Sequence, residues 1–402
     1  MQPDSMTGSE RRAALSLAGI FSLRMLGLFM IYPVFALWAR RLPDATGFSI
    51  GLALGVYGLT QALFQIPLGF LSDRLGRKRI IAAGLLLFAI GSAVAALSHS
   101  IDGIILGRLL QGAGAVGSAV LALAADLTRE QQRTKAMAII GMTIGVSFSL
   151  ALVAGPILNR WIGVPGIFWL TAVLALLGIG VLYTLVPQPL VSRVHGDAEP
   201  VPALFKRVLT HRELLRLDFG IFVQHAILTA SFLSMPLVLK HAGVALHDQW
   251  LVYLPVLVVS VIFMLPLIIL AERGRMKPVF LASVATLGVS QLLLLSGHGG
   301  LPVVMVALLV FFTAFNLLEA SLPSLISRVA PAEAKGTALG IYSSSQFFGI
   351  FVGGALGGWL QGVWGLTGVF GLCAVLAGLW LLVALAMRPP GRPASRAVTG
   401  ET

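Results

Sequence analysis

Long apolar runs separated by short polar gaps make up most of this chain. A helix needs ~20 mainly apolar residues to cross a bilayer, and runs of about that length recur along the whole sequence. They begin near Ala13, Gly51, Ile80, Gly103, Lys135, Pro165, Asp218, Gln249, Pro278, Leu301, Gly336 and Leu366. The pattern therefore predicts an all-α membrane protein with 12 transmembrane helices and both termini on one side of the membrane.

The basic residues are distributed unevenly between the two sides of the predicted membrane. Of the 28 Lys and Arg residues, 22 fall in gaps on the side of the termini, and Arg24 and Arg108 fall inside runs. The other side holds only Arg40, Arg41, Arg160 and Lys240. Because cytoplasmic loops carry the excess of Lys and Arg, this distribution predicts that both termini are cytoplasmic, as in a bacterial inner membrane protein.

The longest polar stretch divides the predicted helices into two groups of six. We expect an N-terminal half over residues 1–187, a cytoplasmic linker over 188–217, a C-terminal half over 218–387 and a short tail over 388–402. Residues 205–215 are basic and have helical spacing, which predicts an amphipathic helix on the anionic membrane surface. Lys-Ala-Met-Ala at 135–138 matches Lys-Gly-Thr-Ala at 335–338, which favours two related halves that rock around a site between them.

The composition supports a membrane protein and excludes several function classes. Charged residues make up 11% of the chain, against about 25% in a soluble domain. The net charge of +12 is explained by the bases in the gaps, so we expect no nucleic-acid partner. The single cysteine, Cys373, excludes an intramolecular disulfide. Nucleotide-binding, hydrolase and metal-binding patterns are absent, so we expect no enzyme activity, cofactor or metal site.

A charged island between the second and third runs is the most distinctive stretch. It reads Gly69-Phe-Leu-Ser-Asp73-Arg74-Leu-Gly76-Arg77-Lys78-Arg79. Arg and Lys cost roughly 2.5–3.5 kcal/mol each at the bilayer centre, so the island must lie at a membrane surface. Asp73 can pair with a neighbouring base there and lock a tight helix–helix turn. The alternative is a basic loop with no moving part.

The spacing Gly69-x3-Asp73-Arg74-x-Gly76-Arg77-Lys78 resembles motif A, the signature of the major facilitator superfamily of secondary transporters. This resemblance implies the fold of that superfamily. It also implies that Asp126, at the end of the fourth run, is the partner of Arg77 in a latch that holds the outward-facing state. A helix C-terminus disfavours a carboxylate without a counter-charge, which agrees with a pair. A solvated loop acid is the alternative for Asp126.

Other segments resemble the YajR-type efflux group of the superfamily. They include Gln61-Ala-Leu-Phe-Gln65-Ile-Pro67, Asp126-Leu-Thr-Arg129-Glu130 and Tyr342-Ser-Ser-Ser-Gln346. YajR-type proteins carry a soluble domain after the last helix. Only the 15 residues of 388–402 follow the last run here, so we expect that domain to be missing.

Ionisable residues inside the runs are candidates for proton coupling, because an unpaired charge in hydrocarbon is costly. Glu319 is the carboxylate well inside a run, and Asn316 is expected to line the same cavity. His225 is a candidate proton site or an interhelical hydrogen-bond partner. Arg108 begins the sequence RLLQGAG at 108–114, which resembles the family's motif B, whose arginine is associated with proton coupling. The alternatives are a structural hydrogen bond for Glu319 and snorkelling to the interface for Arg108.

Polar and aromatic residues within the runs are candidates for a substrate cavity. Arg24 lies roughly 16 Å into the first run at 1.5 Å per residue, close to the midplane. The other candidates are Tyr32, Gln61, Gln65, Asn316, Tyr342 and Gln346, with Phe232 and Phe312 beside them. Structural packing is the alternative for each.

Small residues form candidate faces for close helix packing, which is common in membrane proteins. They are Gly112, Gly145, Gly155 and Pro156. The dipeptide Gly155-Pro156 resembles the end of motif C, the antiporter signature. Met142, Ala151 and Asn159 stand where that motif prefers glycine, so the resemblance supports exchange only in part.

Together these features predict a secondary active transporter, specifically a proton-coupled antiporter that exports hydrophobic or amphiphilic compounds by alternating access. One alternative is a uniporter or symporter of a small organic anion or sugar, and Arg24 favours the anion. Another is a non-transporting membrane sensor or scaffold. The expected partners are a small-molecule substrate, protons and the lipid bilayer, and we expect a monomer.

Overall fold

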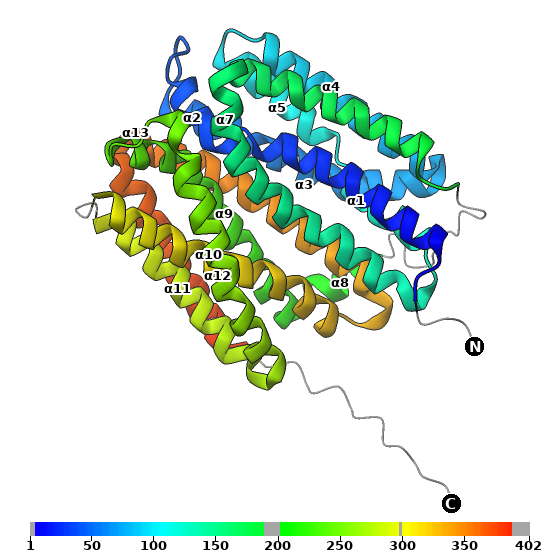
Figure 1. The fold of residues 1–402 in the computed structure, drawn as a ribbon. Coiled ribbons are helices and arrows are strands. Elements are labelled where there is room, and N and C mark those ends of the chain that lie inside the picture. The colour runs from blue at the N-terminus through cyan, green and yellow to red at the C-terminus, as the bar shows by residue number, and fades with distance from the viewer. Residues whose placement is uncertain (1–4, 189–201, 297–299, 388–402) are drawn as a thin grey trace, which may run out of the picture.

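The computed structural model describes residues 5–188, 202–296 and 300–387, and all regular structure in these ranges is helical (Figure 1). The first part of the chain forms α1 (Gly8–Phe29), α2 (Tyr32–Ala39), α3 (Gly47–Leu75), α4 (Arg77–Leu97), α5 (Ile101–Ala113), α6 (Gly117–Asp126) and α7 (Glu130–Thr184). The second part forms α8 (Pro202–Leu209), α9 (Arg212–His241), η2 (Leu246–Asp248), α10 (Trp250–Leu270), η3 (Ala271–Arg275), α11 (Met276–Ser296), α12 (Gly300–Val329), η4 (Ala332–Ala334) and α13 (Lys335–Leu385).

Nine helical stretches in the described ranges are long and apolar enough to cross a membrane. Three of them have double length, with 55, 51 and 51 residues, whereas one crossing needs ~20. Each of these three turns at a glycine with positive φ, namely Gly163 (67°), Gly274 (93°) and Gly365 (65°). L side chains rarely adopt such a conformation, so the glycines permit sharp reversals. Nine stretches with three internal reversals agree with the twelve predicted helices.

The helices form two bundles that meet along α3 and α13. In the first bundle, α1 packs against α7, and α4 packs against α5 and α7. In the second bundle, α9 packs against α13, and α12 packs against α10 and α11. The start of α1 and the end of α13 lie at the same end of the molecule, which we term the terminal end (Figure 1). The other end is termed the opposite end.

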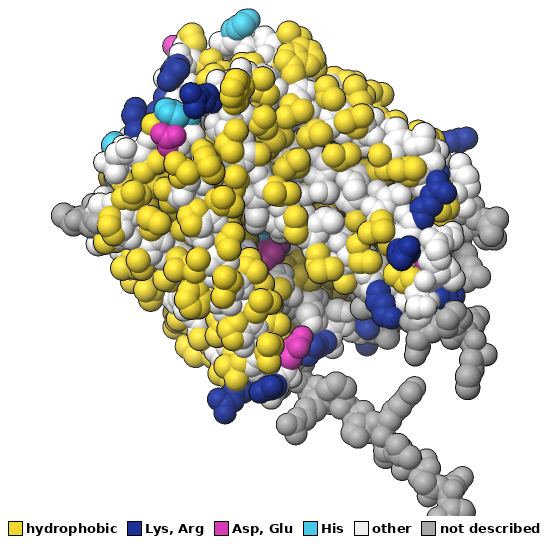
Figure 2. All heavy atoms as spheres, in the orientation of Figure 1, with side chains coloured by type: hydrophobic (Ala, Val, Ile, Leu, Met, Phe, Trp, Pro, Cys, Tyr) yellow, Lys and Arg dark blue, Asp and Glu magenta, His cyan; other side chains and the backbone are white. Residues whose placement is uncertain are grey.

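Hydrophobic side chains cover the middle of the molecule, and basic side chains gather toward its two ends (Figure 2). Large apolar residues that soluble proteins bury are exposed here, with Trp161 at 79% and Trp364 at 66% exposure. An apolar surface of this extent is expected to face lipid.

The bundles approach each other most closely where glycines of α3 and α13 face one another. A Cβ atom on Gly51 would lie 2.7 Å from the Cα atom of Gly358, and one on Gly55 would lie 2.8 Å from the carbonyl oxygen of Phe351. Only residues without side chains allow such backbone contact. This glycine seam lies in the half of α3 that is nearer the opposite end.

The linker differs in part from the prediction of one helix over residues 205–215. The helix α8 ends at Leu209, and α9 begins at Arg212, with His211 Nδ1 accepting a hydrogen bond from the Leu214 N–H at 3.4 Å. Residues 205–215 are therefore helical on both sides of a helix cap at His211 and do not form one continuous helix. The exposed Arg207 of α8 forms an ion pair with Glu333, which ties the linker to the second bundle. The predicted tail over 388–402 lies outside the described residues.

Candidate functional site

Arg77 lies between two carboxylates at the terminal end of the first bundle. Its guanidinium forms an ion pair with Asp73, and its Nε donates to Oδ2 of Asp126 at 3.1 Å. A further hydrogen bond runs from Nη1 to the Ser72 hydroxyl at 2.7 Å. The side chains of Arg77 and Asp126 are 5% and 1% exposed, so this contact is buried. The cluster joins the end of α3, the start of α4 and the end of α6, and a solvated loop acid at position 126 is excluded.

The glycines of motif A shape the turn around this cluster. Gly76 has a φ of 97°, which lets α4 begin directly after α3. A Cβ atom on Gly69 would lie 2.9 Å from the Ser118 hydroxyl, so α3 and α6 pack closely there. Arg74 is exposed. The motif therefore contributes backbone geometry as well as charge.

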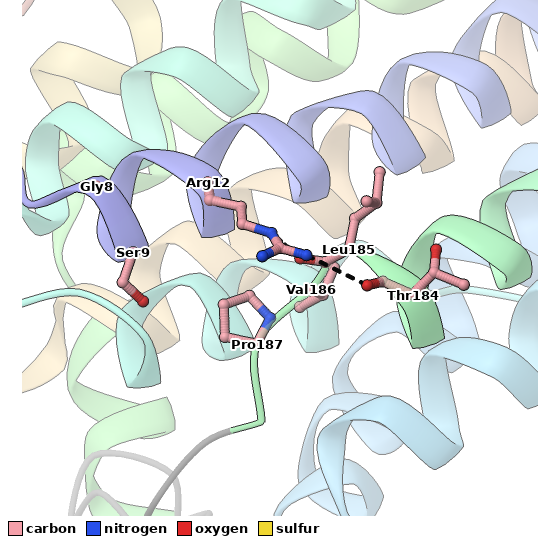
Figure 3. Close-up of a pocket in the computed structure, with 7 residues that line it drawn as sticks. All are labelled: Gly8, Ser9, Arg12, Thr184, Leu185, Val186 and Pro187. Atoms are coloured by element: carbon pink, nitrogen blue, oxygen red, sulfur yellow. Dashed lines mark hydrogen bonds between the residues drawn. The ribbon is translucent and has the colours of Figure 1, made fainter.

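Lys78 continues the motif into a contact with the end of α7. Its Nζ donates to the carbonyl oxygen of Val186 at 2.6 Å. Arg12 of α1 donates to the neighbouring carbonyls of Leu185 at 3.0 Å and Thr184 at 3.3 Å (Figure 3). Cations at a helix C-terminus satisfy its free carbonyl groups and its dipole. Arg12, Thr184, Leu185 and Val186 line a cavity of about 430 Å³, which none of the predicted substrate-cavity residues lines.

Arg24 is held inside the first bundle by neutral groups. Its Nη2 donates to the Tyr57 hydroxyl and to Oε1 of Gln61, each at 2.6 Å, and Gln61 donates onward to Gln65 at 2.8 Å. The guanidinium lies over the rings of Tyr57 and Phe88. Its Nε and Nη1 have no hydrogen-bond partner among the described residues, and the residue is 1% exposed. Arg24 is therefore a buried cation with spare donors.

Arg108 is buried between α3 and α5, and the snorkelling alternative is wrong. The residue is 2% exposed. Its Nε donates to the Ala53 carbonyl at 3.1 Å, and its Nη1 donates to Oε1 of Gln111 at 2.7 Å. It lies over the Tyr57 ring at 5.1 Å from the centroid. Gly112 packs directly against the carbonyl of Tyr57, so motif B holds α5 onto α3.

Glu319 of α12 forms the centre of a polar cluster in the second bundle. Its Oε2 accepts a hydrogen bond from Gln224 Nε2 of α9 at 2.9 Å, and its Oε1 accepts one from Gln346 Nε2 of α13 at 3.3 Å. The Glu319 side chain is 24% exposed. Two neutral amides therefore hold the carboxylate, and Nε2 of His225 lies 3.8 Å from its Oε2.

His225 has hydrogen bonds that fit its neutral form. Its Nδ1 lies 3.3 Å from the Ile221 carbonyl, and its Nε2 lies 2.9 Å from Nε2 of Gln346. A proton on Nδ1 donates to the carbonyl, and the free Nε2 then accepts from the Gln346 amide. A second proton on Nε2 would displace that amide and face Glu319. Glu319 and His225 are therefore the two groups of this cluster that can bind a proton, and the neutral amide of Gln346 bridges them.

Packed aromatic rings separate this cluster from the opposite end. Phe148 of α7 lies 6.0 Å from Phe232, 6.2 Å from Phe312 and 6.2 Å from Phe315, measured between ring centroids. On its other side, Phe148 meets Phe29 at 5.0 Å, which in turn meets Tyr32 at 5.8 Å. These six residues are all buried, and we term them the aromatic barrier. They come from both bundles, so the barrier can form only while the bundles meet.

Asp218 of α9 is a site residue that the sequence did not predict, because it stands at the start of an apolar run. It is 5% exposed, and neither carboxylate oxygen has a hydrogen-bond partner in the described part of the chain. It precedes His225 by seven residues, which is two helical turns on the same face. The Tyr342 hydroxyl also lacks a partner and is within electrostatic range of both Asp218 and Glu319. The signal was a carboxylate at the start of a long apolar run.

Two other predicted residues lie away from this cluster. Asn316 donates to the Ser260 hydroxyl of α10 at 3.4 Å, whereas Glu319 contacts α9 and α13. Although the two residues are three positions apart on α12, their side chains therefore contact different neighbouring helices.

Gly145 is exposed with nothing within 4 Å of its Cβ position, so the predicted close packing is absent there. Gly155, beside Pro156, does pack closely, with a Cβ position 2.5 Å from the Met30 carbonyl.

The sequence model of the Major Facilitator Superfamily matches residues 17–255 and 217–402. The chain belongs to the major facilitator superfamily. It is 46% identical over 391 residues to the inner membrane transport protein YajR of Escherichia coli strain K12, covering 97% of this chain and 86% of the relative. The predicted resemblance is thus confirmed, and the chain is a multi-pass membrane transporter.

More distant comparisons agree with this family. The quinolone resistance protein NorA of Staphylococcus aureus strain MRSA252 is 28% identical over 214 residues, covering 52% of this chain and 51% of NorA. A crystal structure of a bacterial homologue of the human lysosomal transporter Spinster, in an inward-facing and occupied conformation, has a TM-score of 0.78 at 13% identity. It covers 95% of this chain and 97% of its own, and it shows the same major facilitator fold.

Proposed function

We propose that this transporter is a proton-coupled antiporter that exports hydrophobic or amphiphilic compounds by alternating access. The observation that carries the proposal is the Glu319 cluster. A carboxylate with only neutral hydrogen-bond donors around it is costly to leave charged in a membrane interior. It is therefore suited to bind either a proton or a cationic compound, and the two compete for one site. Exchange of a proton for a compound requires that the two bind to the same site in turn, which this competition provides.

The orientation supports export from the cytoplasm. The bias of the bases toward the terminal end favours a cytoplasmic position for that end. In this arrangement, Glu319 is approached from the cytoplasm, and the aromatic barrier closes the path to the outside. The apolar rings of Phe148, Phe232 and Phe312 also offer a surface for an amphiphilic compound. Opening the barrier requires the two bundles to separate at the opposite end, which is the rocking motion of alternating access.

The Arg77 cluster is proposed to act as the conformational latch, although its ion pairs are intact here while the opposite end is closed, so they do not by themselves hold the outward-facing state. It lies wholly within the first bundle, so it does not itself bridge the two bundles in this conformation. It fixes the direction in which α3 enters the seam with α13. A change at Arg77 is therefore transmitted to the contact along which the bundles rock. The equilibrium between conformations shifts by the difference in the free energy of this contact between the two states.

Proton movement driven by an added compound is the direct test. Purified protein is placed in liposomes that contain a pH dye, and an inside-acid gradient is imposed. We expect lipophilic cations to release protons from the liposomes at a rate that saturates with compound concentration. Equilibration of a labelled solute without proton movement would overturn antiport and favour a uniporter.

Asp218 is proposed to pass protons between the cytoplasm and Glu319, with Tyr342 between them. We expect Asp218→Asn to slow compound-driven proton release severalfold without abolishing it, because Glu319 remains and water can replace the lost carrier. The same liposome assay measures the rate. Asp102→Asn changes an exposed carboxylate at the start of α5 and is the matched control. An unchanged rate in Asp218→Asn would remove Asp218 from the path.

Arg24 supports a second candidate function, which is transport of a small organic anion. Its two unpartnered donors are suited to a carboxylate or phosphate. Within this conformation it is covered by Tyr57 and Phe88, so an anion would reach it only after a rearrangement of α3 and α4. Electrogenic uptake of a labelled anion that fails in Arg24→Gln would favour this candidate over export.

A further inference from the structure

A cavity of about 480 Å³ opens at the opposite end, between the ends of α2 and α9. Its walls include Leu37, Arg40, Arg41, Leu237, Lys240 and His241. The first three come from the first bundle and the last three come from the second. The cavity is therefore assembled by the contact between the bundles, and it lies far along α9 from the Glu319 cluster.

The charge of this cavity is unusual for its side of the membrane. Only four of the chain's Lys and Arg residues fall on that side, and three of them line this one cavity. The fourth, Arg160, is exposed on α7 and does not line it. No acidic residue lines the cavity in the described part of the chain. The nearby carboxylate of Asp248 lies 3.2 Å from His247, so it already has a partner.

Arg40 illustrates the lack of a counter-charge. Its Nη2 donates to the neutral amide oxygen of Gln361 across the bundle contact at 3.2 Å. Partial burial lowers the pKa of the Arg40 guanidinium from its ordinary value. Like charges that two bundles bring together repel each other, so closure at this end carries an electrostatic cost.

Helix capping accounts for only part of this arrangement. Arg40 is the C-cap residue of α2, and Lys240 and His241 lie in the last turn of α9, where cations interact favourably with the helix dipole. Capping does not explain why two such helix ends face each other across an unfilled volume. It also does not explain the apolar wall of Leu37 and Leu237 beneath the charges.

We propose that this cavity binds an amphiphilic anion, with its phosphate or carboxylate group among Arg40, Arg41 and Lys240 and its apolar part against Leu37 and Leu237. Because the site needs both bundles, a bound anion stabilises the state that is closed at the opposite end. Opening that end separates Arg41 from Lys240 and destroys the site, so the anion opposes opening by its binding free energy. The anion comes either from an acidic phospholipid of the bilayer or from a soluble amphiphile.

Thermal unfolding of the full chain in a neutral detergent tests binding. The probes are short-chain phosphatidylglycerol, short-chain phosphatidylcholine, octyl phosphate and inorganic phosphate. We expect phosphatidylglycerol or octyl phosphate to raise the Tm of the wild type at concentrations at which phosphatidylcholine does not. A response to phosphatidylglycerol alone assigns the site to lipid, and a response to octyl phosphate as well assigns it to soluble amphiphiles too. Equal potency of inorganic and octyl phosphate would overturn the amphiphilic site.

Arg41→Gln is the test variant, and Arg160→Gln is its matched control. Both remove one exposed arginine from the same side, so neither is expected to impair folding. We expect Arg41→Gln to weaken the anion response at least threefold and Arg160→Gln to leave it unchanged. Equal responses in the two variants would overturn the proposal.

A distance measurement tests the conformational consequence. Spin labels at Pro43→Cys and Asp248→Cys, in a Cys373→Ser background, report the separation of the bundles at the opposite end. We expect the anion to raise the fraction of short distances in the wild type and not in Arg41→Gln. A distance distribution that the anion leaves unchanged would refute the stabilisation. Neither measurement depends on transport, so antiport and this site can fail separately.

Discussion

Glu319→Gln is expected to reduce compound-driven proton release in liposomes to the background of empty liposomes. The substitution keeps the size of the side chain and an oxygen that accepts from Gln224, but it removes the only group of the cluster that can carry a negative charge. Without that charge, a proton and a cationic compound no longer compete, so exchange stops. The measurement is the rate of the internal pH change after addition of a lipophilic cation.

Controls separate this loss from misfolding. Glu130→Gln makes the same chemical change at an exposed residue at the start of α7, and we expect normal proton release from it. Glu319→Gln should also keep a Tm within a few degrees of the wild type, because Gln224 and Gln346 can both re-form their hydrogen bonds. Full proton release from a folded Glu319→Gln protein would show that another group carries the proton and would reduce Glu319 to a structural residue.

Arg77→Gln is expected to lower the free energy of unfolding by about 3–5 kcal/mol, because it breaks the buried ion pairs of the guanidinium with Asp73 and Asp126. Asp73 and Asp126 lie on either side of the guanidinium, and both would face each other without it. Transport should also fall, because we propose that this contact orients α3 relative to α13. Thermal unfolding in detergent and the liposome assay measure the two effects.

Two variants sharpen this test. Arg79→Gln removes the exposed basic residue two positions further along and is expected to change the Tm little, as exposed charges contribute about 0–1 kcal/mol. Adding Asp126→Asn to Arg77→Gln removes one of the two like charges that Arg77 separates and should recover part of the lost stability. If Arg77→Gln and Arg79→Gln behaved alike, the cluster would be only a basic loop.

The sequence alone predicted the transmembrane helices and the place of motif A. A segment that crosses a bilayer must be long, apolar and hydrogen-bonded within its own backbone. Each span is therefore recognisable from its own stretch of sequence, and the spans can be counted. The predicted runs that begin near Pro165 and Leu366 start directly after the reversals at Gly163 and Gly365. At each reversal, two spans follow one another without a loop between them. The pairing of Arg77 with Asp126 was predicted only through a family resemblance, because 49 positions separate the two residues.

The tertiary structure decided which buried polar groups meet. The sequence left two positions for the Arg108 side chain, beside a cavity or at the membrane interface. In the structure, α3 supplies carbonyl acceptors that hold it inside the bundle. Asn316 and Glu319 share a helix turn, yet their partners lie on different helices. Asp218 stands at the boundary of an apolar run in the sequence, and only packing against α13 brings it near Tyr342. The cavity at Arg41 and Lys240 arises from helix ends that are about 200 positions apart. Apolar spacing is a local property, but hydrogen-bond partners depend on how the two bundles dock, which no single segment encodes.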